Sequence, residues 1–199
     1  MISQDITKKN YEEANEWHIE KSLAHSWLPQ LERFVSWLPE GGKILEVGSG
    51  GSGRDTEEFS NRGFVVDTLD YSHAAVVSLR TKFPDMQVYE ADMRNIELSG
   101  ESYNGVWACA AIVNLAKNDI PETLAGFYRL LRKDGVVFVS AKEGEGEKVV
   151  PDKAGERFFS FFKESELKEI MEKAGFQIRY SEVVTGLVGT RWVCIYAVK

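Results

Sequence analysis

The chain has 199 residues, of which 43% are hydrophobic, and its formal net charge is −7. This length suits one compact domain, residues 1–199, and the negative charge argues against a surface built for nucleic acid or an anionic membrane. The two cysteines are too few for a disulfide framework, no apolar run reaches membrane-spanning length, and the N-terminus lacks a signal core. We therefore expect a cytoplasmic protein.

The first 40 residues have helical character, and from residue 41 onward strand-like and helix-like segments alternate. Residues 8–26 are polar and helical in pattern, residues 28–38 carry an apolar stripe, and "PEGG" ends that helix. Further strands are expected at 43–47, 64–69, 86–91, 105–111 and 135–141, and further helices at 54–61, 72–82 and 119–131. Such alternation is typical of a mostly parallel sheet covered by helices on both faces.

The C-terminal segment departs from this alternation. After a helix expected at 164–174, two strand-like runs, 176–184 and 190–198, are separated only by "TGLVG". That connection is too short for a crossover helix, so the two runs should form an antiparallel hairpin. The charged segment 143–157 is interpreted as a polar loop at the rim of a site.

A glycine-rich turn follows the first strand of the alternating region. "GSGGSG" at 48–53 fits G-x-G-x-x-G, the pattern of dinucleotide-binding turns. A bare backbone in such a turn brings N–H groups close to a ligand. The loop alone fits either a dinucleotide or a cationic nucleoside such as S-adenosylmethionine.

Three acidic residues near successive strand ends favour the cationic ligand. Glu46 precedes the loop, Asp70 ends the second strand, and Asp92 follows the third. Glu46 would repel a pyrophosphate and attract an ammonium or sulfonium group. Asp70 lies where a carboxylate accepts ribose hydroxyls, and Asp92 where it can accept a bond from an adenine amino group.

Together, "ILEVGSGGSGRD", "VVDTLDYS", "YEADMRN", "YNGVWACAAI", "LLRKDGVVFVS" and "EKAGFQI" resemble the ordered motifs of class I S-adenosylmethionine-dependent methyltransferases. The most similar pattern is that of small bacterial methyltransferase-domain proteins. The resemblance implies a Rossmann-like three-layer α/β/α sandwich. Its seven-stranded, mostly parallel sheet would have the order 3-2-1-4-5-7-6, with residues 41–199 as the core and residues 1–40 as a helical lid.

The resemblance also assigns cofactor-binding positions. The methionine part would be held at Glu46 and the glycine loop, the ribose at Asp70, the adenine at Tyr71 and Asp92, and the amino group by carbonyls at the end of the fourth strand. The implied residues are Glu46, Gly48, Ser49, Gly50, Asp70, Tyr71, Asp92, Met93, Ala108 and Cys109. The sequence departs from the family at Gly51, which lengthens the glycine loop, and at Asn114, where close relatives often have histidine.

The methyl acceptor is harder to predict, because acceptor residues come from variable segments. A "DPPY"-like motif is absent after the fourth strand, which favours a small-molecule acceptor over nucleic acid. Candidate pocket residues are Tyr11, Trp17, Asn114, Glu143 and Arg157, with Tyr11 and Asn114 as catalytic candidates. The three histidines show no metal-ligand spacing, so no metal is expected. The sequence does not distinguish a monomer from a homodimer.

Two alternatives remain open from the sequence. The literal G-x-G-x-x-G match would suit a nicotinamide-dependent oxidoreductase, although Glu46 and the missing Tyr-x-x-x-Lys pair argue against it. The lengthened loop and Asn114 would suit a protein that binds S-adenosylmethionine or S-adenosylhomocysteine and transfers nothing.

Overall fold

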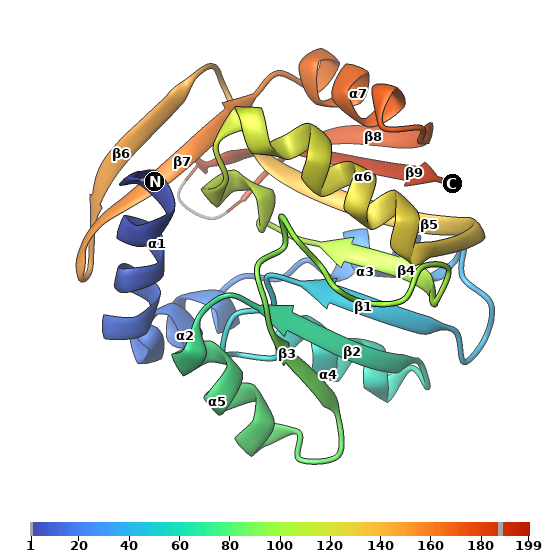
Figure 1. The fold of residues 1–199 in the computed structure, drawn as a ribbon, viewed down its shortest axis with the longest axis horizontal. Helices are drawn as coiled ribbons and strands as arrows, with labels where there is room; N and C mark the ends of the chain where they lie inside the picture. Colours follow the sequence, from blue (N-terminus) through green and yellow to red (C-terminus); the bar gives the residue numbers. More distant parts are fainter. Residues whose placement is uncertain (1, 187–188) are drawn as a thin grey trace.

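The computed structural model describes residues 2–186 and 189–199. These residues form one mixed sheet with helices on both of its faces (Figure 1). The helices are α1 (Ile2–Glu13), α2 (Asn15–Leu23), α3 (Leu28–Val35), α4 (Arg54–Asn61), α5 (His73–Lys82), α6 (Ile120–Leu130) and α7 (Glu164–Lys173), with short 3-10 turns η1 (Ile112–Asn114) and η2 (Lys117–Asp119). The strands are β1 (Lys43–Val47), β2 (Val65–Asp70), β3 (Gln87–Glu90), β4 (Tyr103–Ala108), β5 (Leu131–Glu143), β6 (Glu147–Asp152), β7 (Gly155–Phe162), β8 (Gln177–Thr185) and β9 (Arg191–Val198).

The predicted Rossmann-like topology is confirmed. The parallel strands run in the order β3-β2-β1-β4-β5, and β5 then pairs antiparallel with β9, which pairs antiparallel with β8. This is the expected order 3-2-1-4-5-7-6, with β9 as its seventh strand and β8 as its sixth. The C-terminal hairpin is also confirmed, although residues 187 and 188 of its predicted turn lie outside the described residues.

The strand count is higher than expected, because the segment predicted as a polar loop forms a hairpin. Strands β6 and β7 pair from Glu147 opposite Ser160 to Asp152 opposite Gly155. The charged residues of β6 are mostly exposed, while Phe158 and Phe159 of β7 are buried. A charge run on an exposed edge strand therefore concealed the strand. Pro151 is tolerated because an edge strand does not need every N–H group.

The hairpin of β6 and β7 lies beyond the end of β4. Lys142 near the end of β5 pairs with Trp192 of β9 on one edge and with Phe161 of β7 on the other. The second edge is the one that β4 occupies earlier, up to Ala108 opposite Val139. The long strand β5 thus carries β7 to the carboxyl end of β4.

Apolar side chains close the sheet on both faces. One cluster joins β1, β4, β5 and β9 to α6 and α7 through residues such as Leu124, Phe127 and Met171. The opposite cluster joins the sheet to α3 and α4 around Trp107, whose ring stacks on Phe138 with centroids 4.0 Å apart. Helix α5 packs on β2 and β3.

The N-terminal helices lie at the carboxyl ends of the parallel strands. In Figure 1, α1 and α2 lie beside the arrowheads of β1, β2 and β4, and α1 extends toward β7. Thr7 fixes α1 there, because its hydroxyl oxygen accepts a hydrogen bond from the N–H group of Phe158 at 3.0 Å. None of the helices in the described part of the chain is long and apolar enough to cross a membrane.

Candidate functional site

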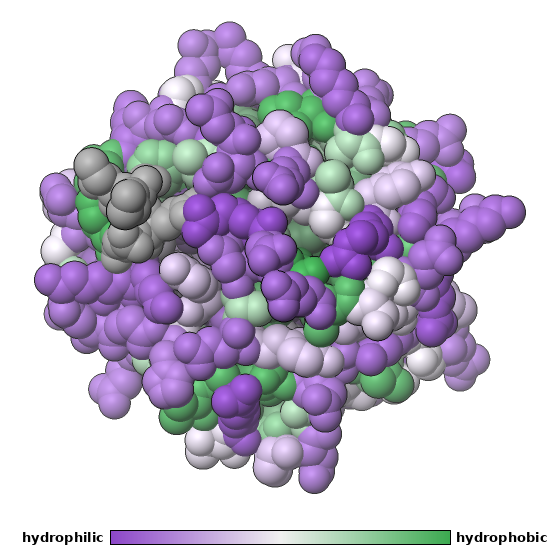
Figure 2. Space-filling model, in the orientation of Figure 1, coloured by the Kyte–Doolittle hydropathy of each residue, from purple (hydrophilic) through white to green (hydrophobic). Residues whose placement is uncertain are grey.

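A cavity of about 630 Å³ lies between the N-terminal helices and the carboxyl ends of the parallel strands. The surface seen in Figure 2 is mostly hydrophilic, and apolar residues show between the polar ones. Of the residues predicted to bind the cofactor, the cavity is lined by Glu46, Gly48, Ser49, Gly50, Asp70, Tyr71, Asp92, Met93 and Cys109. Ala108 is fully buried in β4 and does not line it; Ala110 and Ala111 do so instead.

The glycine loop presents bare backbone to this cavity. Gly48 and Gly50 both adopt the left-handed region, with φ of +68° and +62°. A Cβ on Gly48 would lie 2.7 Å from the Cβ of Ala111, whereas one on Gly50 would meet nothing within 4 Å. The loop therefore needs glycine at 48 for packing and backbone conformation, and the chain passes Gly50 with open space beside it.

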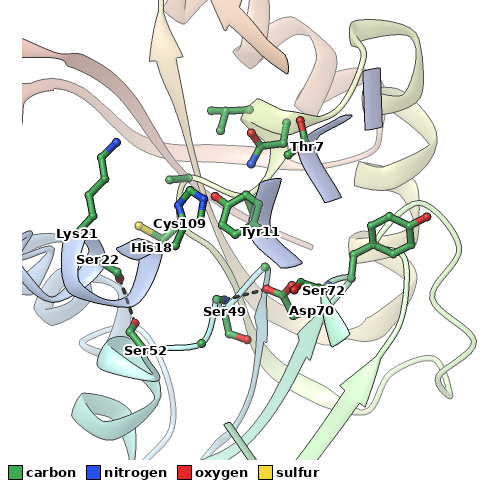
Figure 3. Close-up of a pocket in the computed structure, with 18 of the residues that line it drawn as sticks. Thr7, Tyr11, His18, Lys21, Ser22, Ser49, Ser52, Asp70, Ser72 and Cys109 are labelled. Atoms are coloured by element: carbon green, nitrogen blue, oxygen red, sulfur yellow. Dashed lines mark hydrogen bonds between the residues drawn. The ribbon is translucent and has the colours of Figure 1, made fainter. Parts of the chain in front are cut away.

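Asp70 supports the glycine loop from the end of β2. Its carboxylate accepts a hydrogen bond from the N–H group of Gly50 at 2.8 Å and another from Ser72 at 2.9 Å, the first of which appears in Figure 3. Burial raises the pKa of Asp70, and these two backbone bonds act against that rise. The side chain thus holds the loop in place and still lines the cavity.

Glu46 is a buried carboxyl group in β1 at the inner wall of the cavity. The Thr56 hydroxyl group donates a hydrogen bond to it. Burial, followed by the nearby Asp55 carboxylate, raises the pKa of Glu46 to about 8. The group is therefore largely protonated at neutral pH, and a cation placed beside it would favour its charged form.

The third predicted acid, Asp92, is paired with Arg94. The guanidinium group contacts both carboxylate oxygens, and the Arg94 N–H group donates a further bond at 2.9 Å. Although burial acts to raise the pKa of Asp92, the bonds from Arg94 lower it. Tyr71 lines the neighbouring wall, with the Lys8 ammonium group 4.1 Å from its ring centroid.

Gly51, the additional residue of the loop, has a structural reason. A Cβ at this position would lie 2.8 Å from Oδ1 of Asn15 and 3.0 Å from Cδ1 of Ile19, so α2 packs directly on the loop. Beside this contact, the hydroxyl groups of Ser22 and Ser52 form a 3.0 Å hydrogen bond (Figure 3). The longer loop provides the surface on which α2 packs.

Sequence reasoning missed the ion pair that fastens this contact. Arg54 forms a two-pronged pair with Asp55 at 2.6 and 2.8 Å, and its Nη1 donates to the carbonyl groups of Ser22 and His25. Asp55 also accepts a bond from the buried indole of Trp107 at 2.9 Å. The "GRD" triplet was the available signal, because both residues follow the last glycine of the loop.

The N-terminal helices contribute an aromatic wall opposite the strand ends. Figure 3 shows Tyr11, His18 and Lys21 across the cavity from Ser49 and Asp70. The Tyr11 and His18 rings stack with centroids 4.1 Å apart, and the Trp17 ring meets His18 edge-on at 4.9 Å. These contacts place the predicted Tyr11 and Trp17 in the cavity wall together with His18, which was not predicted.

His18 is neutral in this setting. Burial, followed by the charge of Arg157, lowers the pKa of His18 to about 4. Its Nε2 lies 2.7 Å from Oδ1 of Asn10, which can only accept, so Nε2 carries the proton and Nδ1 keeps its lone pair.

Arg157 and Asn114 also line the cavity, as predicted, but Glu143 does not. Arg157 donates to the Tyr11 hydroxyl oxygen at 2.9 Å, whereas Glu143 forms an ion pair with Arg191. Oδ1 of Asn114 is buried and has no hydrogen-bond partner among the described residues, and the same holds for the Ser49 hydroxyl group. A buried polar atom on a cavity wall without a partner indicates a place for a ligand.

Comparison with known proteins identifies the family. Residues 19–181 match the model of a methyltransferase domain. The 1,6-didemethyltoxoflavin-N1-methyltransferase of Burkholderia thailandensis, solved with 1,6-didemethyltoxoflavin and S-adenosylhomocysteine, superposes with a TM-score of 0.80 at 19% identity, covering 96% of this chain and 86% of that one. A search of curated proteins finds no match.

Two further structures share the fold. An S-adenosylmethionine-dependent methyltransferase of Methanosarcina mazei gives a TM-score of 0.75 at 17% identity, covering 82% of this chain and 95% of the other. A TehB-like methyltransferase of Corynebacterium glutamicum gives 0.72 at 18% identity, covering 96% and 97%.

The oxidoreductase interpretation of the glycine loop is therefore wrong. The chain belongs to the methyltransferase-domain family, as a class I S-adenosylmethionine-dependent methyltransferase, and S-adenosylmethionine is the cofactor of that class.

Proposed function

We propose that this chain transfers the methyl group of S-adenosylmethionine to a small-molecule acceptor held under the N-terminal helices. The observation that carries this proposal is the order of Glu46, Asp70 and Asp92 along the strand ends, all facing one cavity beside the glycine loop. Glu46 lies in β1, Asp70 ends β2 and Asp92 follows β3, an order that suits the amino acid, ribose and adenine parts of one extended ligand. A pyrophosphate would meet acidic side chains along the same path.

The residues of the cavity fit this cofactor. The bare backbone at Gly50 leaves room for the methionine part, and the unpartnered Ser49 hydroxyl group lies on the same wall. Glu46 would hold the ammonium group, since a cation stabilises the buried carboxylate that is otherwise protonated. Asp70 would accept the ribose hydroxyls with lone pairs not used by Gly50 and Ser72, while Tyr71, Asp92 and Met93 would surround the adenine.

The protein's share of the reaction is positioning and exclusion of water. When bound, S-adenosylmethionine supplies a methyl group already activated on a sulfonium centre. The acceptor would enter beyond the end of β4, where Asn114 Oδ1 can accept a hydrogen bond from an N–H or O–H group and orient the neighbouring lone pair. Helices α1 and α2 would cover the acceptor, and the Arg157 bond fixes the Tyr11 hydroxyl group beside it.

Isothermal titration calorimetry with S-adenosylhomocysteine tests the cofactor part of this proposal, with NAD as the parallel ligand. We expect S-adenosylhomocysteine to bind and NAD not to bind. Asp70→Asn, which removes the charge and keeps the shape, should weaken binding at least tenfold, whereas the exposed Asp85→Asn should leave it unchanged.

Transfer itself is tested by incubating the protein with S-adenosylmethionine and a panel of small acceptors and measuring S-adenosylhomocysteine formation. Turnover with at least one acceptor is the expected result. Tight cofactor binding without turnover across a broad panel would favour the silent-binder alternative. Binding of NAD in place of S-adenosylhomocysteine would overturn the assignment of the acidic residues.

A further inference from the structure

The acidic side chains of the cavity gather at one of its ends. The acidic residues that line it are Glu46, Asp55, Asp70 and Asp92, all on or after β1, β2 and β3. Two of the basic residues at that end are compensated, since Arg54 pairs with Asp55 and Arg94 pairs with Asp92, and the third, Lys8, lies over the Tyr71 ring. At the opposite end the balance is reversed.

Three cationic side chains meet at the end beneath α1 and α2. Lys21 comes from α2, Lys142 from the end of β5 and Arg157 from β7, and all three line the cavity. Only Arg157 has an acidic partner, with Nε 2.6 Å from Oδ2 of Asp152. In the part of the chain that the structure describes, Lys21 and Lys142 have no carboxylate within ion-pairing distance; instead they lie over the rings of Trp17 and Phe159, at 4.5 and 3.4 Å.

We propose that the methyl acceptor is a small organic anion with a planar apolar body, whose charged group is bound by Lys142, Lys21 and Arg157. This inference rests on the proposed function, because it names the acceptor class of the same cavity. An anionic group here would compensate a local excess of two positive charges in a protein whose net charge is −7. A cationic amine would be repelled.

The electrostatic state of Lys142 agrees with a missing counter-charge. Burial, followed by the charges of Arg157 and Lys21, lowers the pKa of Lys142 to about 8, and Asp152 acts against that effect. The facing His18 contributes no charge at neutral pH. An anion beside Lys142 would raise its pKa again, so binding should take up protons near pH 8.

The walls around these cations are aromatic. Tyr11, Trp17 and Phe159 line the same end of the cavity, and Phe159 is only 3% exposed. Flat apolar walls pack well against a planar body, and a polar group at one edge fixes its direction. Asn114, with its unpartnered Oδ1, lies where the group to be methylated could be oriented.

The test uses full-length protein saturated with S-adenosylhomocysteine and measures binding of matched acid and amide pairs by calorimetry. The probes are 4-hydroxybenzoate with 4-hydroxybenzamide, salicylate with salicylamide, and 2-naphthoate with 2-naphthamide, with benzylamine as the cationic probe. We expect the acid of at least one pair to bind at least tenfold more tightly than its amide, with proton uptake at pH 8.

Lys142→Met should abolish both the preference for the acid and the proton uptake. Lys148→Met, which removes an exposed lysine of β6 outside the cavity, should change neither. Equal binding of acids and amides, binding of none of the acids to a protein that holds S-adenosylhomocysteine, or preferred binding of benzylamine would overturn the inference and leave the proposed function standing.

The affinity of Lys142→Met for S-adenosylhomocysteine is also informative. If Lys142→Met weakens S-adenosylhomocysteine as strongly as it weakens the acid probes, the cations serve the carboxylate of the cofactor, and the inference is overturned. If wild-type protein fails to bind S-adenosylhomocysteine at all, the proposed function fails first.

Discussion

The two ends of the cavity are built in opposite ways. The end at β1, β2 and β3 carries carboxylates, of which Glu46 and Asp70 have raised pKa values, whereas the end beneath α1 and α2 carries lysines, of which Lys21 and Lys142 have lowered ones. In each case burial is the largest cause and disfavours the charged form. Each end therefore lacks a counter-charge: the acidic end lacks a cation, and the basic end lacks an anion.

Under the two proposals above, one elongated site would bind two ligands of complementary charge. A cationic ligand suits the acidic end and an anionic one suits the basic end, so the two would attract each other across the cavity. The ends are joined mechanically where α2 packs on the glycine loop. Variants at the junction where α2 packs on the glycine loop should affect both ends of the cavity, while variants within one end should leave the other unchanged.

The largest expected effect comes from breaking the junction. Arg54→Met removes the partner of the buried Asp55 carboxylate and the bonds to the Ser22 and His25 carbonyl groups. Breaking a buried pair from one side typically costs about 3–5 kcal/mol, so the free energy of unfolding by urea should fall by that order. Arg62→Met, which removes a more exposed helical pair with Glu58, should cost only about 0.5 kcal/mol. Equal losses for both variants would contradict the role assigned to Arg54.

A smaller change should result from filling the space at the extra glycine. Gly51→Ala places a Cβ against Asn15 and Ile19 of α2, and overpacking of this kind costs about 1–3 kcal/mol. Limited proteolysis should then cleave the first 40 residues faster than in the wild type. Gly126→Ala, in α6 with nothing within 4 Å, should instead stabilise the protein by roughly 0.5–1 kcal/mol.

Within the acidic end, Glu46→Gln should separate stability from binding. Because the folded protein holds the Glu46 proton up to a pKa of about 8, against 4.5 for the ordinary group, the unfolded chain binds fewer protons between these values. The wild type therefore loses stability as pH rises through this range, and the variant does not. The unfolding free energy of the variant relative to wild type should increase from pH 5 to pH 8.5.

The same Glu46→Gln variant should bind S-adenosylhomocysteine about tenfold more weakly, or about 1.4 kcal/mol, because the ammonium group loses its carboxylate. In the wild type, binding at pH 7 should release protons, which calorimetry in buffers of different ionisation enthalpy measures. Retained affinity together with unchanged proton release in the variant would show that Glu46 does not bind the ammonium group.

The smallest expected effect tests the basic end alone. Tyr11→Phe removes the hydroxyl oxygen that accepts from Arg157 and should cost about 0.5–1.5 kcal/mol of stability. Its affinity for S-adenosylhomocysteine should stay within twofold of the wild type, while KM for the acceptor rises. Tyr128→Phe, whose hydroxyl group has no hydrogen-bond partner in the described residues, is the matched control. A loss of cofactor affinity equal to the rise in KM would show that the ends are not separable.

The acidic end could be predicted from the sequence, and the basic end could not. Glu46, Asp70 and Asp92 each lie at or near the end of a strand, and parallel strands bring their carboxyl ends to one edge of the sheet. Lys21 and Lys142 belong to α2 and β5, two segments with no common sequence pattern, and the tertiary fold brings both to one cavity. Sequence reasoning placed Arg157 at the cavity while interpreting its segment as a loop.

The fold shows the same contrast. The β-α alternation and the hairpin of β8 and β9 follow from local periodicity, and the expected helix at 72–82 begins at its N-cap residue Ser72. Strands β6 and β7 were missed because charged residues are spread along their segment, and Glu147, Lys148 and Glu156 are exposed. The reason for Gly51 was equally hidden, since its neighbours Asn15 and Ile19 are remote in the chain.

The bond between Thr7 and the Phe158 N–H group has a consequence for solubility. That N–H group belongs to β7, and Thr7 of α1 accepts its hydrogen bond at a position where, among the described residues, β5 does not pair with β7. An uncovered strand edge is a template for pairing with a second chain. If α1 lifts to exchange ligands, each opening exposes such an edge, so protein without ligands should aggregate on mild heating sooner than protein whose cavity is filled. Ligand occupancy would then protect the enzyme from self-association as well as prepare it for turnover.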